Sequence, residues 1–162
     1  MVSHGKFARF ALAVITLSAL ALGVAGPAAA QAKIGVLMPL SGKGASYGAH
    51  QQVAVKMFQD KGGALTLVVY DTRGENTDAI NLTRKLIGSD HVVAIVGPLF
   101  SGESEVTFPV AVQGKTPIIT PTSAKPGIAA ANRPWAFRNA LTSDKLDGAL
   151  NLVYDLIARV PA

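Results

Sequence analysis

Short, continuous apolar runs alternate with longer amphipathic stretches over residues 33–162. The runs, rich in Val, Ile and Leu, predict strands buried on both faces; they lie at 33–39, 65–70, 91–96 and 116–120, with a short fifth at 135–138. The stretches with apolar residues at helical spacing predict helices; they lie at 47–61, at a segment capped by Asn76 or Thr77, at 103–113 and at 144–159. This alternation predicts an α/β fold with a doubly wound parallel sheet.

Glycine and proline mark the boundaries of these elements. Gly62-Gly63 and Gly114 are expected to end the helices before them, and Pro109 is expected to interrupt or kink the helix at 103–113. Ser143 is expected to cap the last helix, whose apolar stripe is Leu146, Leu150, Val153 and Ile157.

The first 32 residues follow a different pattern. Lys6 and Arg9 precede an apolar run over 11–25, and small residues follow at 28–32. This order is typical of a secretory signal peptide, here cleaved before Gln31 or Lys33, and the alternative is an uncleaved N-terminal anchor helix. We expect a periplasmic protein without stable membrane insertion, in which 1–32 are the signal peptide and 33–162 one folded domain.

Composition narrows the function classes. Because Lys6 and Arg9 leave with the signal, thirteen basic and ten acidic residues remain, a net charge of +3. The basic residues are dispersed and form no stripe with aromatic residues, so a nucleic-acid partner is not expected. The chain has no cysteine, which excludes disulfides and lipidation at a cysteine. The spacing of its histidines and carboxylates suits no metal site, and we expect no cofactor.

Three predicted loops carry the candidate binding chemistry. They span 40–48, 97–103 and 120–126, are dense in Gly, Ser and Thr, and follow strands whose carboxyl ends meet at one edge of a parallel sheet. Ser101 and Gly102 begin a helix, whose free amides attract a carboxylate, and the hydroxyls of Thr122 and Ser123 add hydrogen-bonding groups. The alternative is that these residues serve only as helix caps and turns.

Two enzymatic alternatives rest on glycine motifs. Residues 44–48 match the G-x-S-x-G elbow of serine esterases, but residues 40–43 separate the motif from the strand, and His91 begins a strand at the opposite edge. Gly42, Gly44 and Gly48, with Asp71 at the end of the second strand, approximate a dinucleotide fingerprint whose third glycine comes one place late. Asp71 is alternatively a cap for the turn that follows it.

Several motifs together resemble a known family. They are KIGVLMPLSG (33–42), SYG (46–48), VAIVGP (93–98) with Ser101-Gly102, IITPTS (118–123) and FR (137–138). In this order they are similar to the first lobe of the periplasmic substrate-binding proteins of leucine/isoleucine/valine ABC transporters. The resemblance implies a Rossmann-like type I lobe, without its second lobe, that binds a branched-chain amino acid or similar small carboxylate or amide for a membrane permease and catalyses no reaction.

The resemblance also implies residue roles. Ser101 is expected to bind the ligand carboxylate through its hydroxyl and amide, Ser123 to offer backbone contacts, and Tyr47 to wall the pocket. This chain departs from the family at Ala124, where members often have threonine, and at Phe100, which adds bulk near the crevice. The expected binding residues are Tyr47, Ser101, Gly102, Thr122, Ser123 and Ala124. A ligand-sensing or protein-interaction module built on the same lobe is the alternative.

Overall fold

A computed structural model describes residues 31–62 and 65–158, and its sheet has five strands, all paired in parallel. The strands are β1 (Ala32–Met38), β2 (Leu65–Asp71), β3 (Ala94–Val96), β4 (Ile118–Thr120) and β5 (Ala136–Arg138), in the order β2-β1-β3-β4-β5. The helices are α2 (Ala45–Asp60), α3 (Asn76–Gly88), α4 (Ser101–Gln113) and α5 (Ser143–Ala158), with a 3-10 turn at Ala130–Asn132. The predicted signal peptide lies almost wholly outside the described residues.

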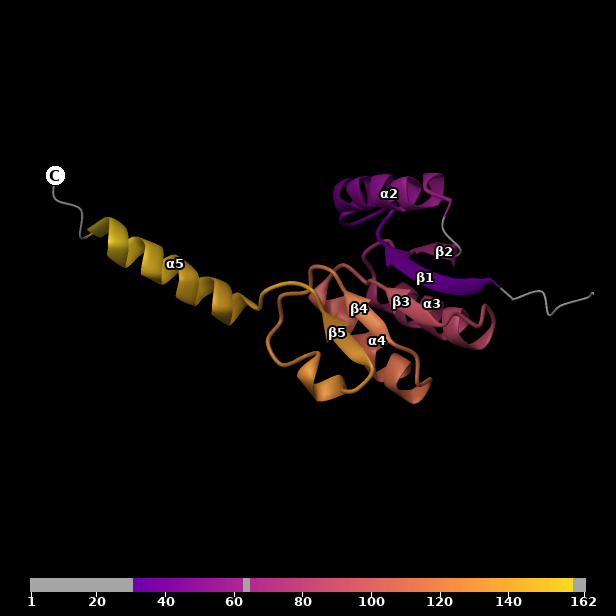
Figure 1. Cartoon of the computed structure of the whole chain (residues 1–162). Coiled ribbons are helices and arrows are strands. Elements are labelled where there is room, and N and C mark those ends of the chain that lie inside the picture. Colours follow the sequence, from indigo (N-terminus) through magenta and orange to yellow (C-terminus); the bar gives the residue numbers. More distant parts are fainter. Residues whose placement is uncertain (1–30, 63–64, 159–162) are drawn as a thin grey trace, which may run out of the picture. The chain divides into compact units, whose positions relative to one another are not determined.

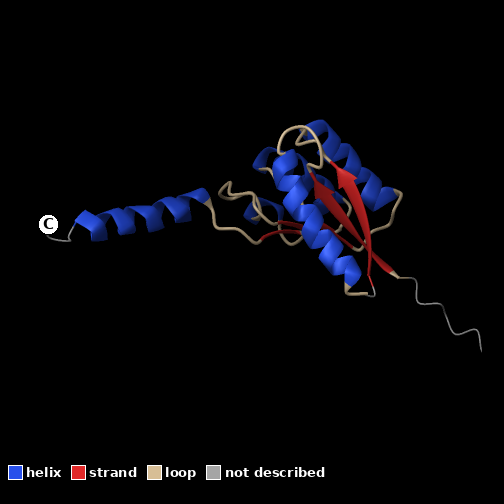
Figure 2. Ribbon diagram, turned by 90° about the horizontal axis from the view of Figure 1, so that it is seen from above, coloured by secondary structure: helices blue, strands red, loops and turns tan. Residues whose placement is uncertain are grey.

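The sheet carries helices on both faces (Figure 1). On one face α3 and α4 cover the main core, where Leu37, Ile95 and Ile118 of the strands pack with Leu86 of α3 and Phe108 of α4. On the other face lies α2, seen across the strands from α3 and α4 in Figure 2. Alternate side chains of each strand point to opposite faces, so both layers are needed to cover the sheet. The predicted doubly wound parallel sheet is confirmed.

The element boundaries differ from the prediction in three places. The run at 91–96 forms a strand only over Ala94–Val96: His91 adopts a left-handed φ of 54°, and the amide of Val92 donates to the Leu86 carbonyl at the end of α3. The cap of α3 is Glu75, so the prediction of Asn76 or Thr77 is wrong. Helix α4 runs uninterrupted through Pro109, since the burial of Phe108 and Ala111 against the sheet outweighs one missing amide.

Helices α2 and α5 leave apolar side chains exposed. Val53 and Met57 of α2 are 59% and 58% exposed, and Gly48 is the one fully buried residue of this helix. Leu146, Leu150 and Val153 of the predicted α5 stripe are about half exposed, and the side chain of Ile157 lies outside the described part. Among the described helices, none has the length and hydropathy to cross a membrane.

Candidate ligand-binding site

An open pocket of about 270 Å³ lies beyond the carboxyl ends of β1, β3 and β4. Five of the six predicted binding residues lie together there; the full lining is Tyr47, Leu99, Phe100, Ser101, Thr122, Ser123 and Ala124. Gly102 is not in the lining. It faces α3, where an added Cβ would lie 3.2 Å from the Asn76 Oδ1 atom. Successive residues of a helix point about 100° apart, so Ser101 and Gly102 cannot both face the pocket.

Side-chain hydroxyls hold the loop after β4 against the loop after β3. At the end of β4, Thr120 Oγ1 donates to the Pro98 carbonyl at 2.8 Å, and in the loop after it Thr122 Oγ1 donates to the Leu99 carbonyl at 2.7 Å. The Ser123 Oγ atom pairs with the Oγ atom of Ser101, the first residue of α4, at 3.1 Å. These bonds lie at the pocket wall, where Ser123 is almost fully buried. The two predicted binding loops therefore form one connected surface.

This hydrogen bonding determines what each side chain can offer a ligand. When Ser123 is the donor in its pair with Ser101, the Ser101 Oγ atom accepts, and the Ser101 hydroxyl proton can be donated into the pocket. The Thr122 proton goes to Leu99, which leaves Thr122 as an acceptor only. The Ser123 amide donates to Thr120 Oγ1 at 3.2 Å, so of its backbone groups the carbonyl remains for a ligand.

Ser101 is also the first residue of the 13-residue helix α4. The first amides of a helix have no partner within it, and the helix dipole places partial positive charge at that end. One free hydroxyl proton beside these amides forms a donor set that suits a carboxylate. Nearby, Lys125 pairs with Glu105 of α4, so its charge is balanced within the protein.

The start of α4 is anchored from inside the protein by Glu103. This fully buried carboxyl accepts the Phe100 amide at 3.0 Å, the second half of a capping arrangement at the helix start. Burial raises the pKa of Glu103 above its ordinary value, against the opposing effect of hydrogen bonds from Thr72 and from backbone amides. The buried side chain thus holds the residue that precedes Ser101.

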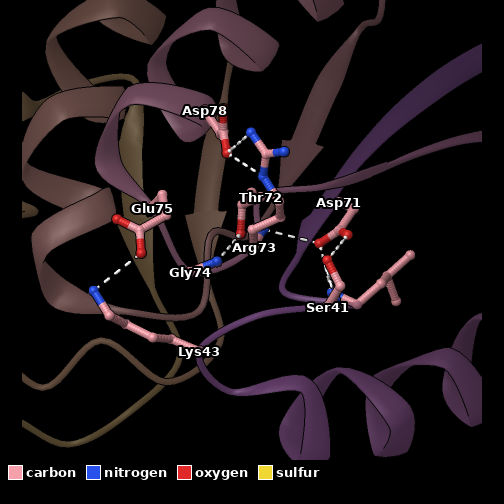
Figure 3. A network of polar contacts seen from close by, with 9 residues as sticks. Ser41, Lys43, Asp71, Thr72, Arg73, Gly74, Glu75 and Asp78 are labelled. Carbon is pink, nitrogen blue, oxygen red and sulfur yellow. Dashed lines mark hydrogen bonds and ion pairs between the residues drawn. The ribbon is translucent and has the colours of Figure 1, made fainter.

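Asp71 anchors the loop after β1. Its carboxylate accepts the amides of Leu40, Ser41 and Arg73 at 2.8, 3.2 and 2.8 Å, and the Ser41 hydroxyl at 2.6 Å. Figure 3 shows this network beside the Arg73–Asp78 and Lys43–Glu75 ion pairs. The prediction that Asp71 caps the turn after it is confirmed. Because donors of the protein itself occupy the Asp71 oxygens, this carboxylate is not available to bind the ribose of a dinucleotide, as the fingerprint motif would require.

Asp71→Asn is expected to lower the free energy of unfolding by about 1–2 kcal/mol at neutral pH, because an amide replaces a carboxylate that accepts four hydrogen bonds. Burial by itself would raise the pKa of Asp71, but the bonds from Ser41, Arg73 and Leu40 outweigh it and lower that pKa below 3.8. The carboxylate's stabilisation is therefore present above pH 3.8 and lost as the pH falls through the lowered pKa.

Urea unfolding at pH 7 and pH 3 measures this effect. The difference between wild type and variant is expected to shrink at the lower pH. Asp60→Asn is the control, since among the described residues Asp60 makes only an exposed ion pair with Lys56. A stability difference that is the same at both pH values would contradict the role given to Asp71.

The esterase motif does not form an elbow. Ser46 is the second residue of α2, and the Nδ1 atom of His50 lies 2.7 Å from the Ser46 carbonyl oxygen. A nucleophile elbow requires the serine at a sharp strand-to-helix turn with its hydroxyl beside a histidine. Within residues 31–62 and 65–158, no group of three or more His, Cys, Asp or Glu side chains is arranged to hold a metal ion.

Comparison with known proteins places this pocket in a family. A family model described as periplasmic binding protein matches residues 31–153. The Leu/Ile/Val-binding protein BraC3 of Rhizobium johnstonii is 31% identical over 115 residues, which cover 66% of this chain and 31% of that protein.

Solved structures agree with the sequence match. The leucine-binding protein LivK of Thermotoga maritima superposes with a TM-score of 0.68 at 27% identity, over 74% of this chain and 35% of its own. LivJ of Streptococcus pneumoniae, in complex with isoleucine, superposes with a TM-score of 0.63 at 26% identity, over 70% of this chain and 34% of its own. A solute-binding protein of Rhodopseudomonas palustris, in complex with 3,4-dihydroxybenzoic acid, superposes with a TM-score of 0.63 at 25% identity, over 68% of this chain and 32% of its own.

The chain spans about a third of the length of these relatives. They are described as binding proteins, three of them named for leucine or branched-chain amino acids, which agrees with the resemblance seen in the sequence motifs. The family model covers most of the chain and includes every strand and every residue of the pocket. This chain therefore belongs to the periplasmic binding protein family.

Proposed function

We propose that this protein is an exported solute-binding protein of an ABC transporter, which holds a small carboxylate at the start of α4 and passes it to a membrane permease. The observation that carries the proposal is the Ser101 hydroxyl, which lines the pocket beside the first amides of the helix and pairs with the Ser123 hydroxyl. A periplasmic location follows from the predicted signal peptide, and the pocket requires no catalytic group.

The ligand class follows from the pocket's lining. Ser101 supplies donors for a carboxylate, Tyr47 and Phe100 supply an apolar wall, and no carboxylate side chain of the described residues lines the pocket to receive an ammonium group. Ala124 has no hydroxyl to add. Isoleucine and 3,4-dihydroxybenzoate, the ligands of two relatives, share the carboxylate and differ in the ammonium. We propose a branched-chain amino acid or a similar small carboxylate or amide as the ligand.

Ser101→Ala is expected to weaken binding of a carboxylate ligand by on the order of 1–3 kcal/mol, because it removes a hydroxyl donor to a charged acceptor. Isothermal titration calorimetry with L-leucine, L-isoleucine and 3,4-dihydroxybenzoate measures the loss and identifies which ligand class binds. Ser46→Ala is the matched control, since Ser46 lies on α2 outside the pocket lining. Equal affinities for wild type and Ser101→Ala would refute the role of Ser101.

A protein-interaction module remains a second candidate because one surface is strongly apolar. Apolar side chains of α2, β1, β2 and β3 line a hollow of about 380 Å³: Ile34, Val36, Ala54, Val55, Phe58, Leu65, Leu67 and Val96. Exposed apolar patches often mark association surfaces. Light scattering distinguishes the candidates, since a concentration-dependent dimer that binds no solute would favour the interaction module.

A further inference from the structure

We propose that Phe100 is the residue that sets the size of the ligand, because its ring is fixed between two glycines as the rigid end wall of the pocket. This inference rests on the proposed solute-binding function and extends it to ligand selectivity. Three observations carry it: the contacts of the ring, the bonds that hold its backbone, and the residues beyond it.

The ring of Phe100 occupies space that only glycine leaves open. At Gly44, in the loop after β1, an added Cβ would lie 2.5 Å from the Phe100 Cζ atom and 2.9 Å from its Cε2 atom. At Gly74, in the loop after β2, an added Cβ would lie 3.1 Å from the same Cε2 atom. Both glycines have positive φ values, 81° and 74°, which other residues rarely adopt. One ring therefore touches both loops.

The backbone of Phe100 is held on both sides. Its amide donates to Glu103 Oε2 at 3.0 Å, and its carbonyl accepts both the amide and the hydroxyl of Ser104 at 3.0 Å. The ring of Tyr47 packs edge-on against that of Phe100, with centroids 6.5 Å apart and planes at 89°. The hydrogen bonds fix the Phe100 backbone, and the loops at Gly44 and Gly74 together with the Tyr47 ring limit the rotation of the Phe100 side chain.

The position of the wall relative to Ser101 determines what fits. Phe100 directly precedes Ser101, and both line the same pocket with Tyr47. A ligand whose carboxylate is held at Ser101 has its other end limited by the two rings. Truncation of Phe100 would leave a hollow bordered by Gly44 and Gly74, neither of which has a side chain to refill it. A longer or bulkier ligand is then admitted.

Calorimetric titration of wild type, Phe100→Leu and Phe100→Ala tests this with two carboxylate series. The probes are L-valine, L-leucine and L-phenylalanine in one series, and benzoate and biphenyl-4-carboxylate in the other. Wild type is expected to prefer the smaller members. Phe100→Ala is expected to shift the ratio of affinities toward the larger members by about tenfold or more, the size of effect that pocket volume produces. Phe100→Leu should lie between them.

A control and a measurement without ligand complete the test. Phe137→Ala removes an aromatic ring of β5 that is 49% exposed and outside the pocket, and it should leave the ranking unchanged. In NMR spectra, the Hα shifts of Gly44 and Gly74 should carry ring-current contributions that Phe100→Leu removes, while the dispersion of other signals shows that the variant is folded.

The outcomes separate the two proposals. Binding with an unchanged size ranking in both Phe100 variants would overturn the role of Phe100 and leave solute binding intact. If the Hα chemical shifts of Gly44 and Gly74 do not change in Phe100→Leu, the Phe100 ring does not lie between these two glycines. A wild-type protein that binds neither series, with variants that bind neither, would overturn solute binding itself and the selectivity that rests on it.

Discussion

Gly97→Ala is expected to destabilise the protein by about 3 kcal/mol or more, because it combines backbone strain with overpacking. Gly97 has a φ of 105°, and an added Cβ would lie 2.2 Å from the Leu37 carbonyl oxygen and 3.0 Å from its carbonyl carbon. Leu37 belongs to β1, which pairs with β2 on one side and β3 on the other, so it has little freedom to move away. Urea unfolding followed by circular dichroism measures the loss.

Gly127→Ala is the matched control for this substitution. Gly127 also has a positive φ, 76°, but an added Cβ there would meet nothing within 4 Å. Its loss is expected to be about 1–2 kcal/mol, the strain of a left-handed backbone alone. If both variants lose the same free energy of unfolding, contact with Leu37 is not the cause. The position matters for function, because Gly97 begins the loop that carries Ser101.

Phe108→Ala is expected to cost about 3–5 kcal/mol, as truncation of a fully buried aromatic side chain usually does. Phe108 is completely buried in the core cluster, on the side of α4 that faces the sheet. Its loss leaves a cavity that neighbours such as Ile118 and Ala111 can fill only partly. Thermal and urea denaturation give the change in stability.

Phe137→Ala provides the comparison, since the Phe137 side chain is 49% exposed. Its loss should stay below about 1 kcal/mol, as for most exposed substitutions. A similar loss for both variants would show that α4 is not held by its inner face. Because Ser101 is the first residue of the same helix, we expect Phe108→Ala to weaken solute binding at temperatures where it loosens α4.

The relation between sequence and structure differs between the core and the site. The apolar runs predicted the strands because strands buried on both faces need continuous hydrophobic side chains. The last three residues of the run at 91–96 and the whole of β5 are in the sheet as expected. Periodicity carries no information on the left-handed backbone at His91, which lies shortly before the three-residue strand β3.

The site was predictable as far as it depends on topology. The carboxyl ends of parallel strands meet at one edge of the sheet, so the segments with Ser101 and Ser123 were expected to lie together. In the structure the hydroxyls of these two residues are hydrogen-bonded to each other. From the sequence, Phe100 was noted only as a residue that adds bulk near the crevice. Its partners Gly44 and Gly74 stand 56 and 26 positions away along the chain, beyond the reach of local pattern.

The sequence by itself determined the α/β class, the strands and helices, the edge of the sheet where the pocket lies, and the family resemblance. These properties depend on the spacing of hydrophobic residues and on local motifs, both of which can be recognised from residues close together in the sequence. Only the tertiary structure decided that Gly102 turns toward Asn76, that the hydroxyls of Ser123 and Ser101 pair, and that one ring fits between two loops. Such properties depend on distances between residues far apart in sequence, and packing alone sets those distances.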